Sequence, residues 1–294
     1  MSSYSNSPKR RKIAVAASAF LAVALSLSGC SGGGTNADST DGAGGTGTLA
    51  KITSSGKMVV GVKFDSPPYG SIPEGTTEPV GFDIDIAAEI GKRLGVKTSF
   101  VQVTAKSRVL ALQTGKIDLI AASMFHTKAR DKAIDFSINY FEDQNRLMVL
   151  GDSDITGTDD LAGRTAALTQ GSTQEVDIKI AQPEVKTLVY QTWPDTLQAL
   201  LRGEADAVVS SNGLLSGLLE TANAAGENVK IVGEGFGEGP VGLGMRQDDS
   251  KFRDAVNFAL MDMQADGTYE EIFQKWWGKS VPNTYQMLTW PDGS

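Results

Sequence analysis

The sequence contains very little cysteine and histidine, and this excludes several kinds of chemistry and of stabilisation. Cys30 is its one cysteine and His126 its one histidine among 294 residues. A single cysteine forms no disulfide within the chain, so the fold must be stabilised by packing. A zinc site of cysteine and histidine ligands needs more of these side chains than the sequence has, and the lipid predicted below on Cys30 leaves no thiol for a Cys/His nucleophile. We therefore expect no metal and no other cofactor.

An excess of positive charge is also missing. The sequence has 27 lysine and arginine residues against 35 aspartate and glutamate residues, and its net charge is −8. Nucleic-acid binding depends on clustered lysine and arginine side chains that neutralise phosphates. We therefore expect no nucleic acid among the partners of this protein.

Long apolar runs are absent except over residues 13–27, which are almost wholly apolar. This run is shorter than the about 20 residues that a membrane-spanning helix needs. Four basic residues at positions 9–12 precede it, and small residues separate it from Cys30. This order is typical of a secretory signal peptide, which we predict over residues 1–29.

The run Leu27-Ser28-Gly29-Cys30 resembles the lipobox of bacterial lipoproteins. The resemblance implies cleavage before Cys30 and attachment of diacylglycerol to its sulfur, and two acyl chains anchor a protein stably where one is marginal. Cleavage removes four basic and no acidic residues, which changes the net charge from −8 to −12. We predict an extracytoplasmic protein held at the outer face of the cell membrane by this lipid alone, on the periplasmic side in a Gram-negative cell. Ordinary secretion with a free thiol is the alternative.

A segment rich in glycine, serine and threonine follows the lipobox. Residues 31–49 contain one large apolar side chain, Leu49, at their end. A segment so poor in apolar surface does not fold, and as a flexible coil it spans roughly 25 Å. We predict a lipidated linker over residues 30–49.

From residue 57 onward, short β-branched runs alternate with helical patterns, which is typical of an α/β fold with largely parallel strands. Strands are predicted at residues 58–62, 98–103, 119–122, 147–150, 165–168, 207–210 and 241–245. Helices are predicted at residues 83–94, 108–113, 173–180, 195–201, 214–221, 252–264 and 269–277.

One pattern occurs twice. Residues 111–123 (ALQTGKIDLIAAS) and residues 199–211 (ALLRGEADAVVSS) each contain a helix pattern, a glycine and a strand pattern that ends at serine. Ligands of open α/β sheets bind beyond the carboxyl ends of the strands. If the two copies belong to lobes that face each other, Ser123 and Ser211 line one cleft. The alternative is a common helix–glycine–strand connection that recurs by chance.

Seven short motifs follow one another along the chain. They are GFDIDIA at 81–87, ALQTGKIDLI at 111–120, TKAR at 127–130, DFSINY at 135–140, QGST at 170–173, GEADAVV at 203–209 and DGTYEEIFQKW at 266–276. In this order they resemble the bacterial extracellular solute-binding proteins of the polar amino-acid type, the capture subunits of ABC importers. The resemblance covers about residues 49–279, and VKFDSPPY at 62–69 is most similar to glutamate- and glutamine-type members from Gram-positive bacteria.

The resemblance implies a two-lobed, periplasmic-binding-protein-like α/β fold, with two hinge strands and a central ligand cleft. We place the crossings near Asn145 and Gly239. Lobe 1 then covers residues 50–144 plus 241–294, and lobe 2 covers residues 145–240. The resemblance also implies a small carboxylated solute as ligand, an ABC transporter permease as partner, a monomer, and no catalytic residue.

Arg130 is the residue on which the ligand prediction depends most. Thr127 can cap a short helix, which places Arg130 in the first turn, where its charge opposes the helix dipole. A cation in that place indicates an anionic partner. In the family, the matching arginine holds the ligand α-carboxylate through a bidentate pair. The alternative is a surface ion pair with Asp131 or Asp135.

Other candidate contacts come from both predicted lobes. Ser172 and Glu175 fit a capping box, and the resemblance gives Ser172 and Thr173 a second carboxylate contact at a helix N-terminus. Tyr69 matches an aromatic residue that stacks on the ligand side chain, with a plain turn as the alternative. We predict ligand contacts at Lys63, Asp65, Tyr69, Ser123, Met124, Phe125, Arg130, Gln170, Ser172, Thr173 and Ser211.

Two acidic residues nearby receive a structural interpretation. Asp83 and Asp85 open the helix predicted at residues 83–94. Carboxylates at a helix N-terminus bond free backbone N–H groups and complement the helix dipole. We therefore interpret both as caps and not as ligand contacts.

Two positions depart from the family pattern. The family usually has a hydroxyl residue where Phe125 stands, and an aspartate that pairs with the ligand ammonium where Ser211 stands. Burying an ammonium beside serine alone costs on the order of several kcal/mol. Either Asp65 or Asp195 takes over that role, or the ligand is not an ordinary α-amino acid. Phe125 makes the pocket more apolar and can hold a cation against its ring.

The function predicted from these residues is non-catalytic: capture of a polar amino acid, glutamate- or glutamine-like, or of a related small carboxylate, and its delivery to a permease. Two alternatives stay open. Dehydratases that act on cyclohexadienyl acids share this fold, but such an enzyme needs a positioned acid or base in the cleft. A sensory lipoprotein that presents ligand to a receptor is the other alternative.

Overall fold

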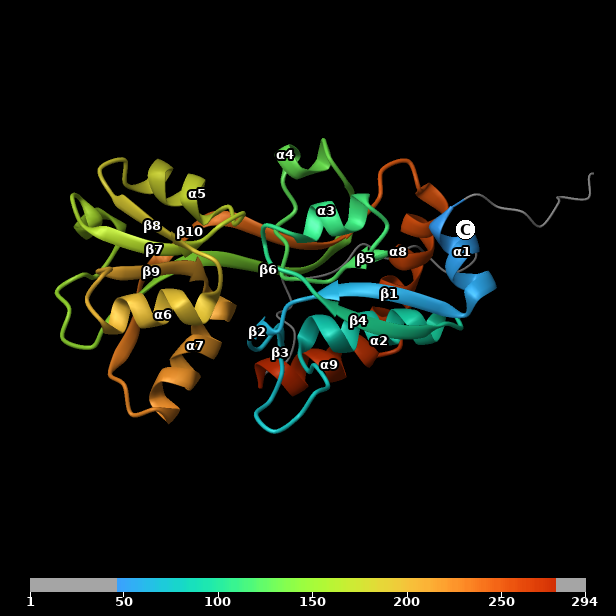
Figure 1. The fold of residues 1–294 in the computed structure, drawn as a ribbon, viewed down its shortest axis with the longest axis horizontal. Helices are drawn as coiled ribbons and strands as arrows, with labels where there is room; N and C mark the ends of the chain where they lie inside the picture. Colours follow the sequence, from blue (N-terminus) through green and yellow to red (C-terminus); the bar gives the residue numbers. More distant parts are fainter. Residues whose placement is uncertain (1–46, 279–294) are drawn as a thin grey trace, which may run out of the picture. The chain divides into compact units, whose positions relative to one another are not determined.

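The computed structural model describes residues 47–278, which belong to one unit of the chain, Ala43–Ser294. The predicted signal peptide, the lipid site at Cys30 and the linker up to residue 46 lie outside the described residues. Within residues 47–278, the main sheet contains eight strands in the order β4-β1-β5-β10-β6-β9-β7-β8 (Figure 1). A separate small sheet pairs β2 (Asp65–Ser66) with β3 (Gly70–Ser71).

One half of the main sheet, which we call lobe 1, contains parallel strands. β1 pairs with β4 on one side and with β5 on the other. The strands are β1 (Lys57–Val62), β4 (Lys97–Gln102) and β5 (Leu119–Ile120). The helices of this half are α1 (Thr48–Ser55), α2 (Phe82–Arg93), α3 (Arg108–Gln113), α4 (Lys128–Asp131), α8 (Ser250–Ala265) and α9 (Thr268–Trp277).

The other half, lobe 2, repeats this arrangement with β7 parallel to both of its neighbours. Its strands are β7 (Thr165–Thr169), β8 (Lys186–Tyr190) and β9 (Ala207–Ser211). Its helices are η1 (Thr158–Leu161), α5 (Gln174–Ala181), α6 (Trp193–Leu201) and α7 (Asn212–Ala224). Figure 1 shows α6 and α7 on one side of these strands and α5 on the other.

Two long antiparallel strands connect the halves. They are β6 (Asp135–Leu150) and β10 (Val229–Met245), and they contain Asn145 and Gly239, where the sequence places the crossings. β10 pairs with β5 of lobe 1, and β6 pairs with β9 of lobe 2. The exact lobe boundaries stay a prediction.

The core explains why these segments adopt these elements. One cluster of buried side chains lies under α2, α8 and α9 and includes Phe82, Tyr140 and Phe252. A second cluster in lobe 2 packs Val149, Leu168 and Val209 from three strands. Burial of such a side chain stabilises the fold by about 1.5–3 kcal/mol. Because a shift of one residue would expose all the apolar side chains of a strand, their alternation determines which face of the strand points inward.

Most predicted elements agree with the structure within a few residues, three predicted segments do not, and β2, β3, β8 and η1 were not predicted. The strand predicted at residues 147–150 is only the end of β6, and the strand predicted at residues 241–245 is only the end of β10. Helix α1 begins at Thr48, inside the predicted linker, because the Thr48 N–H donates to the Asp249 carboxylate at 2.8 Å and Leu49 packs on the core. None of the helices within residues 47–278 is long and apolar enough to cross a bilayer.

Candidate ligand-binding site

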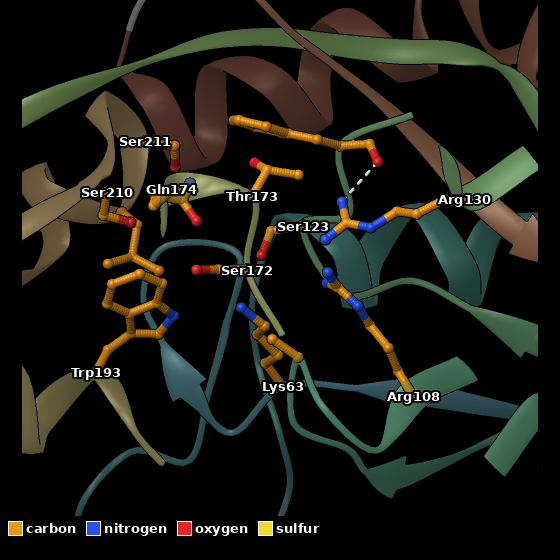
Figure 2. A pocket seen from close by; sticks show the side chains of 13 residues that line it. Lys63, Arg108, Ser123, Arg130, Ser172, Thr173, Gln174, Trp193, Ser210 and Ser211 are labelled. Carbon is orange, nitrogen blue, oxygen red and sulfur yellow. Dashed lines mark hydrogen bonds between the residues drawn. The ribbon is translucent and has the colours of Figure 1, made fainter. Parts of the chain in front are cut away.

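A pocket lies where strands of both lobes end (Figure 2). From lobe 1 it is lined by Lys63, Ala105, Arg108, Ser123, Phe125 and Arg130. From lobe 2 it is lined by Ser172, Thr173, Gln174, Trp193, Ser210, Ser211 and Leu214. Carboxyl ends of parallel strands are where open α/β sheets bind ligands. We call this set the cleft pocket.

Ser123 and Ser211 both line the cleft pocket, as the repeated pattern predicts. Each follows a helix that ends before a glycine in the left-handed region, at φ 75° for Gly115 and 72° for Gly203. Ser123 itself has φ 42°, a conformation that costs a non-glycine residue free energy. Its backbone N–H donates to the buried carboxylate of Asp83 at 2.6 Å, which offsets that cost.

Arg130 is held as the capping pattern predicts. The Thr127 hydroxyl accepts from the Arg130 backbone N–H at 3.3 Å at the start of α4. The Arg130 guanidinium donates to the Phe125 carbonyl at 2.7 Å (dashed in Figure 2) and to the Gly171 carbonyl of lobe 2 at 3.1 Å. Burial lowers the pKa of Arg130 to about 10. The two acceptors that the guanidinium reaches, the carbonyls of Phe125 and Gly171, are both uncharged.

The alternative for Arg130, a surface ion pair, is wrong. Asp131 contacts the His126 ring at 3.1 Å, and Asp135 lies 3.7 Å from the Arg253 guanidinium. Within the part of the chain that the structure describes, neither carboxylate pairs with Arg130. Asp177 acts on Arg130 electrostatically, but its carboxylate accepts from the Asn145 amide at 2.8 Å and does not line the pocket.

Arg108 is a second pocket arginine, which the sequence analysis missed. Its side chain is 2% exposed, and its Nη1 donates to the Ala122 carbonyl at 2.6 Å. The buried Nε has no hydrogen-bond partner among residues 47–278. Burial, and after it the charge of Arg130, lower the pKa of Arg108 well below its usual value. The signal that could have found it is the one used for Arg130, a cation in the first turn of a helix.

Lys63 faces the same space. It directly follows β1, is 5% exposed, and its ammonium lies 5.6 Å from the centre of the Trp193 ring. Burial, with a further contribution from Arg108, lowers the pKa of Lys63 to about 7. Trp193 was also missed. It opens α6, where the Thr192 hydroxyl accepts from the Asp195 backbone N–H at 3.4 Å.

Residues 58–279 match the bacterial extracellular solute-binding proteins, family 3. The chain belongs to this family. The ABC transporter glutamine-binding protein GlnH of Bacillus subtilis is 35% identical over 233 residues, which cover 78% of this chain and 84% of that protein. An ancestral arginine-binding protein bound to glutamine has a TM-score of 0.72 and 37% identity, covering 76% of this chain and 99% of that one. An ancestral amino acid-binding protein described as a precursor of cyclohexadienyl dehydratase has a TM-score of 0.72 and 31% identity, covering 78% of this chain and 99% of that one.

The two positions at which the resemblance implies a different residue, 125 and 211, both belong to the pocket lining. Phe125 lines the pocket and leaves no room for a side chain at Gly239, where a Cβ would lie 2.5 Å from its ring. Ser211 lines the pocket, but Asp65 and Asp195, the two carboxylates expected to replace the missing one, do not. Asp195 instead accepts from the Thr192 hydroxyl at 2.6 Å.

Four residues predicted to touch the ligand lie outside the lining of the cleft pocket. Tyr69 is 1% exposed, packs edge-on against Trp277 and donates to Asp143 at 2.8 Å. Its ring is therefore part of the core of this solute-binding protein. Its neighbour Asp65 accepts from the Ser66 hydroxyl at 3.1 Å in a short hairpin.

Met124 and Gln170 are the other two. Met124 is fully buried in a cluster with Leu112 and Ile134. The Gln170 side chain accepts from Gln191 at 2.9 Å. For the predicted residues that do line the pocket, contact with a ligand stays a prediction.

The predicted capping box is wrong. Helix α5 begins at Gln174, and its N-cap Thr173 makes no side-chain cap. The Ser172 hydroxyl donates to the Thr169 carbonyl at 2.7 Å instead. Gln174, a further lining residue that the sequence did not reveal, donates to Asn145 on β6 at 2.7 Å. The start of α5 is thus tied to the hinge strand.

The interpretation of Asp83 and Asp85 as caps also needs correction. Both lie in the first turn of α2, but the N-cap Gly81 precedes them. Asp83 accepts from the Tyr140 hydroxyl at 2.5 Å, and burial raises the pKa of Asp83 to about 6. Asp85 forms an ion pair with Lys275 at 2.7 Å. Their main role is therefore to join α2 to other parts of lobe 1.

Proposed function

We propose that this chain is the substrate-binding protein of an ABC importer. It captures a small carboxylated solute outside the cell, either a polar amino acid of the glutamate or glutamine kind or a related carboxylate, and delivers it to the permease. Membership of the extracellular solute-binding family supports this role. A relative named as an ABC transporter glutamine-binding protein supports the transporter and the ligand class.

The observation that carries the proposal is the position of Arg130. Its guanidinium lies in the cleft pocket and bonds one carbonyl from each lobe, Phe125 and Gly171. A ligand carboxylate offers charge-assisted, bidentate bonds that neutral carbonyls do not. A ligand held there contacts both lobes, so binding favours the arrangement in which the lobes meet.

The lipid anchor is part of the same proposal. A signal peptide over residues 1–29 and diacylglyceryl on Cys30 would keep the protein at the outer face of the membrane. Metabolic labelling with a radioactive fatty acid tests this, with Cys30→Ala as control. Label on the native chain and none on the variant supports the anchor, and an unlabelled native chain rejects it.

A thermal-shift screen across amino acids and small carboxylates tests the binding function, because a ligand that binds only the folded state raises the melting temperature. We expect at least one carboxylated solute to stabilise the full chain and Arg130→Met to abolish that shift. Uptake of the same solute, with and without the gene, separates transport from sensing. The absence of any stabilising solute rejects the proposal.

Catalysis is the second candidate, since one similar structure is described as a precursor of cyclohexadienyl dehydratase. Lys63, with a pKa of about 7, is the described lining residue best suited to move a proton. Ultraviolet absorbance of a cyclohexadienyl acid follows such turnover directly. We expect no turnover. If the native chain turns over such an acid and Lys63→Met does not, the protein is an enzyme and the proposed binding function is wrong.

A further inference from the structure

The side chains around the cleft pocket carry an unusual balance of charge. Lys63, Arg108 and Arg130 line it, and none of the described lining residues is acidic. Figure 2 shows both guanidinium groups and the ammonium pointing into the same space. Buried charges are costly unless they are paired. One ligand carboxylate on Arg130 leaves the other two cations unmatched.

Arg108 has donors to spare for a ligand. A guanidinium carries five N–H groups. Among residues 47–278, the Ala122 carbonyl is the acceptor that the Arg108 side chain reaches, and its Nε is buried without a partner. Arg108 and Arg130 also repel each other. The carboxylate of Asp83 offsets part of this repulsion, but it forms no hydrogen bond with Arg108 and leaves these N–H groups available.

Lys63 is also free to bind a ligand. Its ammonium lies over the Trp193 ring, and no described residue accepts a hydrogen bond from it. The Lys63 side chain is 5% exposed, so solvent cannot fully replace such a partner. Together with Arg108, it forms a second cationic group beside Arg130.

The nearby carboxylates are already engaged outside the pocket lining. Asp83 accepts from Ser123 and Tyr140. Asp143 accepts from the Tyr69 hydroxyl and from the Gly213 N–H at 2.9 Å. Asp83 offsets part of the positive charge of Lys63 and Arg108 without bonding to either of them. Neither Asp83 nor Asp143 lines the pocket, where a ligand ammonium would need a partner.

On the basis of the proposed binding function, we infer that Lys63 and Arg108 form a second carboxylate subsite and that the ligand is a small dicarboxylate without an ammonium group. Arg130 holds one carboxylate, and Lys63 and Arg108 hold the other. Ser211, where the family resemblance implies an aspartate for the ligand ammonium, lines the pocket with a hydroxyl group, and hydroxyl groups suit neutral polar atoms. The protein therefore differs in ligand charge from a relative named as glutamine-binding.

Isothermal titration calorimetry on the full chain tests this inference with succinate, glutarate, glutamate and glutamine. Glutamate adds an ammonium to glutarate, and glutamine additionally replaces one carboxylate by an amide. We expect succinate or glutarate to bind at least tenfold more tightly than glutamine and no more weakly than glutamate. Arg108→Leu and Lys63→Met should each weaken that binding at least 30-fold and change the affinity for glutamine less than threefold.

Two variants serve as controls. Lys106→Met removes an exposed positive charge two residues before Arg108, outside the lining, and should change dicarboxylate affinity less than threefold. Lys63→Arg keeps the charge and should retain affinity within tenfold. If Arg108→Leu does not fold, as judged by circular dichroism, the pair of Lys63 variants decides.

The outcomes separate this inference from the proposed function. Tighter binding of glutamine or glutamate than of either dicarboxylate overturns the inference and leaves solute binding intact. Equal loss on Lys106→Met and Lys63→Met also overturns it, because the effect would then be one of net charge. If none of the four solutes binds and the wider screen also fails, both proposals fall.

Discussion

The guanidinium of Arg130 reaches the carbonyl of Gly171 across the cleft pocket, with 3.1 Å between Nη2 and the oxygen. The two residues come from different lobes, and the backbone of Gly171 packs on Ala105 and Lys106. A ligand that replaces this bond by a stronger one changes the contact between the lobes itself. Under the proposed function, ligand recognition and the meeting of the lobes are therefore coupled at one side chain.

Replacing Arg130 with methionine should weaken binding of the preferred carboxylate by about 2–5 kcal/mol, the usual cost of removing one member of a buried charge pair. Calorimetry measures the loss. Arg253→Met, which removes an arginine that lies near Asp135 outside the pocket, is the matched control and should leave affinity unchanged. Equal affinity in the Arg130 variant would contradict the role given to this residue.

Replacing Gly171 with alanine should prevent the close approach of the lobes. A Cβ there would lie 2.8 Å from the Lys106 Cα and 2.9 Å from the Ala105 backbone. At φ 82°, the substitution also costs about 1–2 kcal/mol of stability. Gly163→Ala has the same backbone cost at φ 73° with open space around it. Both variants should melt at lower temperature, and only Gly171→Ala should lose ligand affinity, at least tenfold. Similar affinities in both would show that the contact is irrelevant to binding.

Binding of an anion should take up a proton above neutral pH. The pKa of Lys63 is about 7 without ligand, since burial and Arg108 disfavour its charge, whereas Asp65 and Asp83 oppose this shift. An anion beside Lys63 raises that pKa again, so affinity should fall as pH rises from 7 to 9. Calorimetry in buffers with different ionisation enthalpies measures the proton uptake. Asp83, with a pKa of about 6, titrates below this window. Lys63→Met should abolish the uptake, and uptake that persists in this variant would assign it to another group.

The same lysine affects the stability of the ligand-free protein. Because its folded-state pKa lies below the unfolded value of 10.5, the unfolded chain binds more protons between about pH 7 and 10.5. The contribution of Lys63 to the free energy of unfolding should therefore increase as pH rises through this range. Chemical denaturation at several pH values between about 7 and 10.5 measures the free energy of unfolding of the native chain and of Lys63→Met. If the difference between the two stays constant over this pH range, the expectation is wrong.

Tyr69→Phe distinguishes the family-based expectation from the structure. Tyr69 donates to the Asp143 carboxylate, and a hydrogen bond to a charged group contributes about 1.5–3 kcal/mol of stability. Its ring lies in the core, so the affinity for ligand should change less than threefold. Tyr190→Phe, which removes an exposed bond to Glu204, should leave both quantities unchanged. A large loss of affinity with little loss of stability would return Tyr69 to the ligand site.

Much of the fold could be predicted because its strands and helices have clear apolar periods, and α3 has the predicted bounds. The edge strand β8 was missed although its sequence favours a strand, and its apolar residues Leu188 and Val189 are exposed at the edge of the sheet and not packed in a core. In β6, polar residues around Glu142 lie where the strand passes from one core to the other, so its pattern reads as two fragments.

The site was predictable where a local motif marks a residue and not where tertiary packing does. Thr127 identifies the short helix that carries Arg130. Arg108 and Lys63 are far apart in the sequence, and they meet because β1 lies beside β5 and α3 packs against both strands. Tyr69 was misplaced because a family motif gives the identity of a residue but not the direction of its side chain.

The pairing of β6 with β10 is irregular in its middle part and regular toward the 229–232 end. Register shifts occur on both sides of Phe236 and again around Gly242. Bulged segments lack part of the backbone ladder, so twisting there breaks few hydrogen bonds. Rotation of one lobe against the other can thus be confined to this segment while the remaining strands move as rigid bodies, and the elastic cost of each capture cycle stays low.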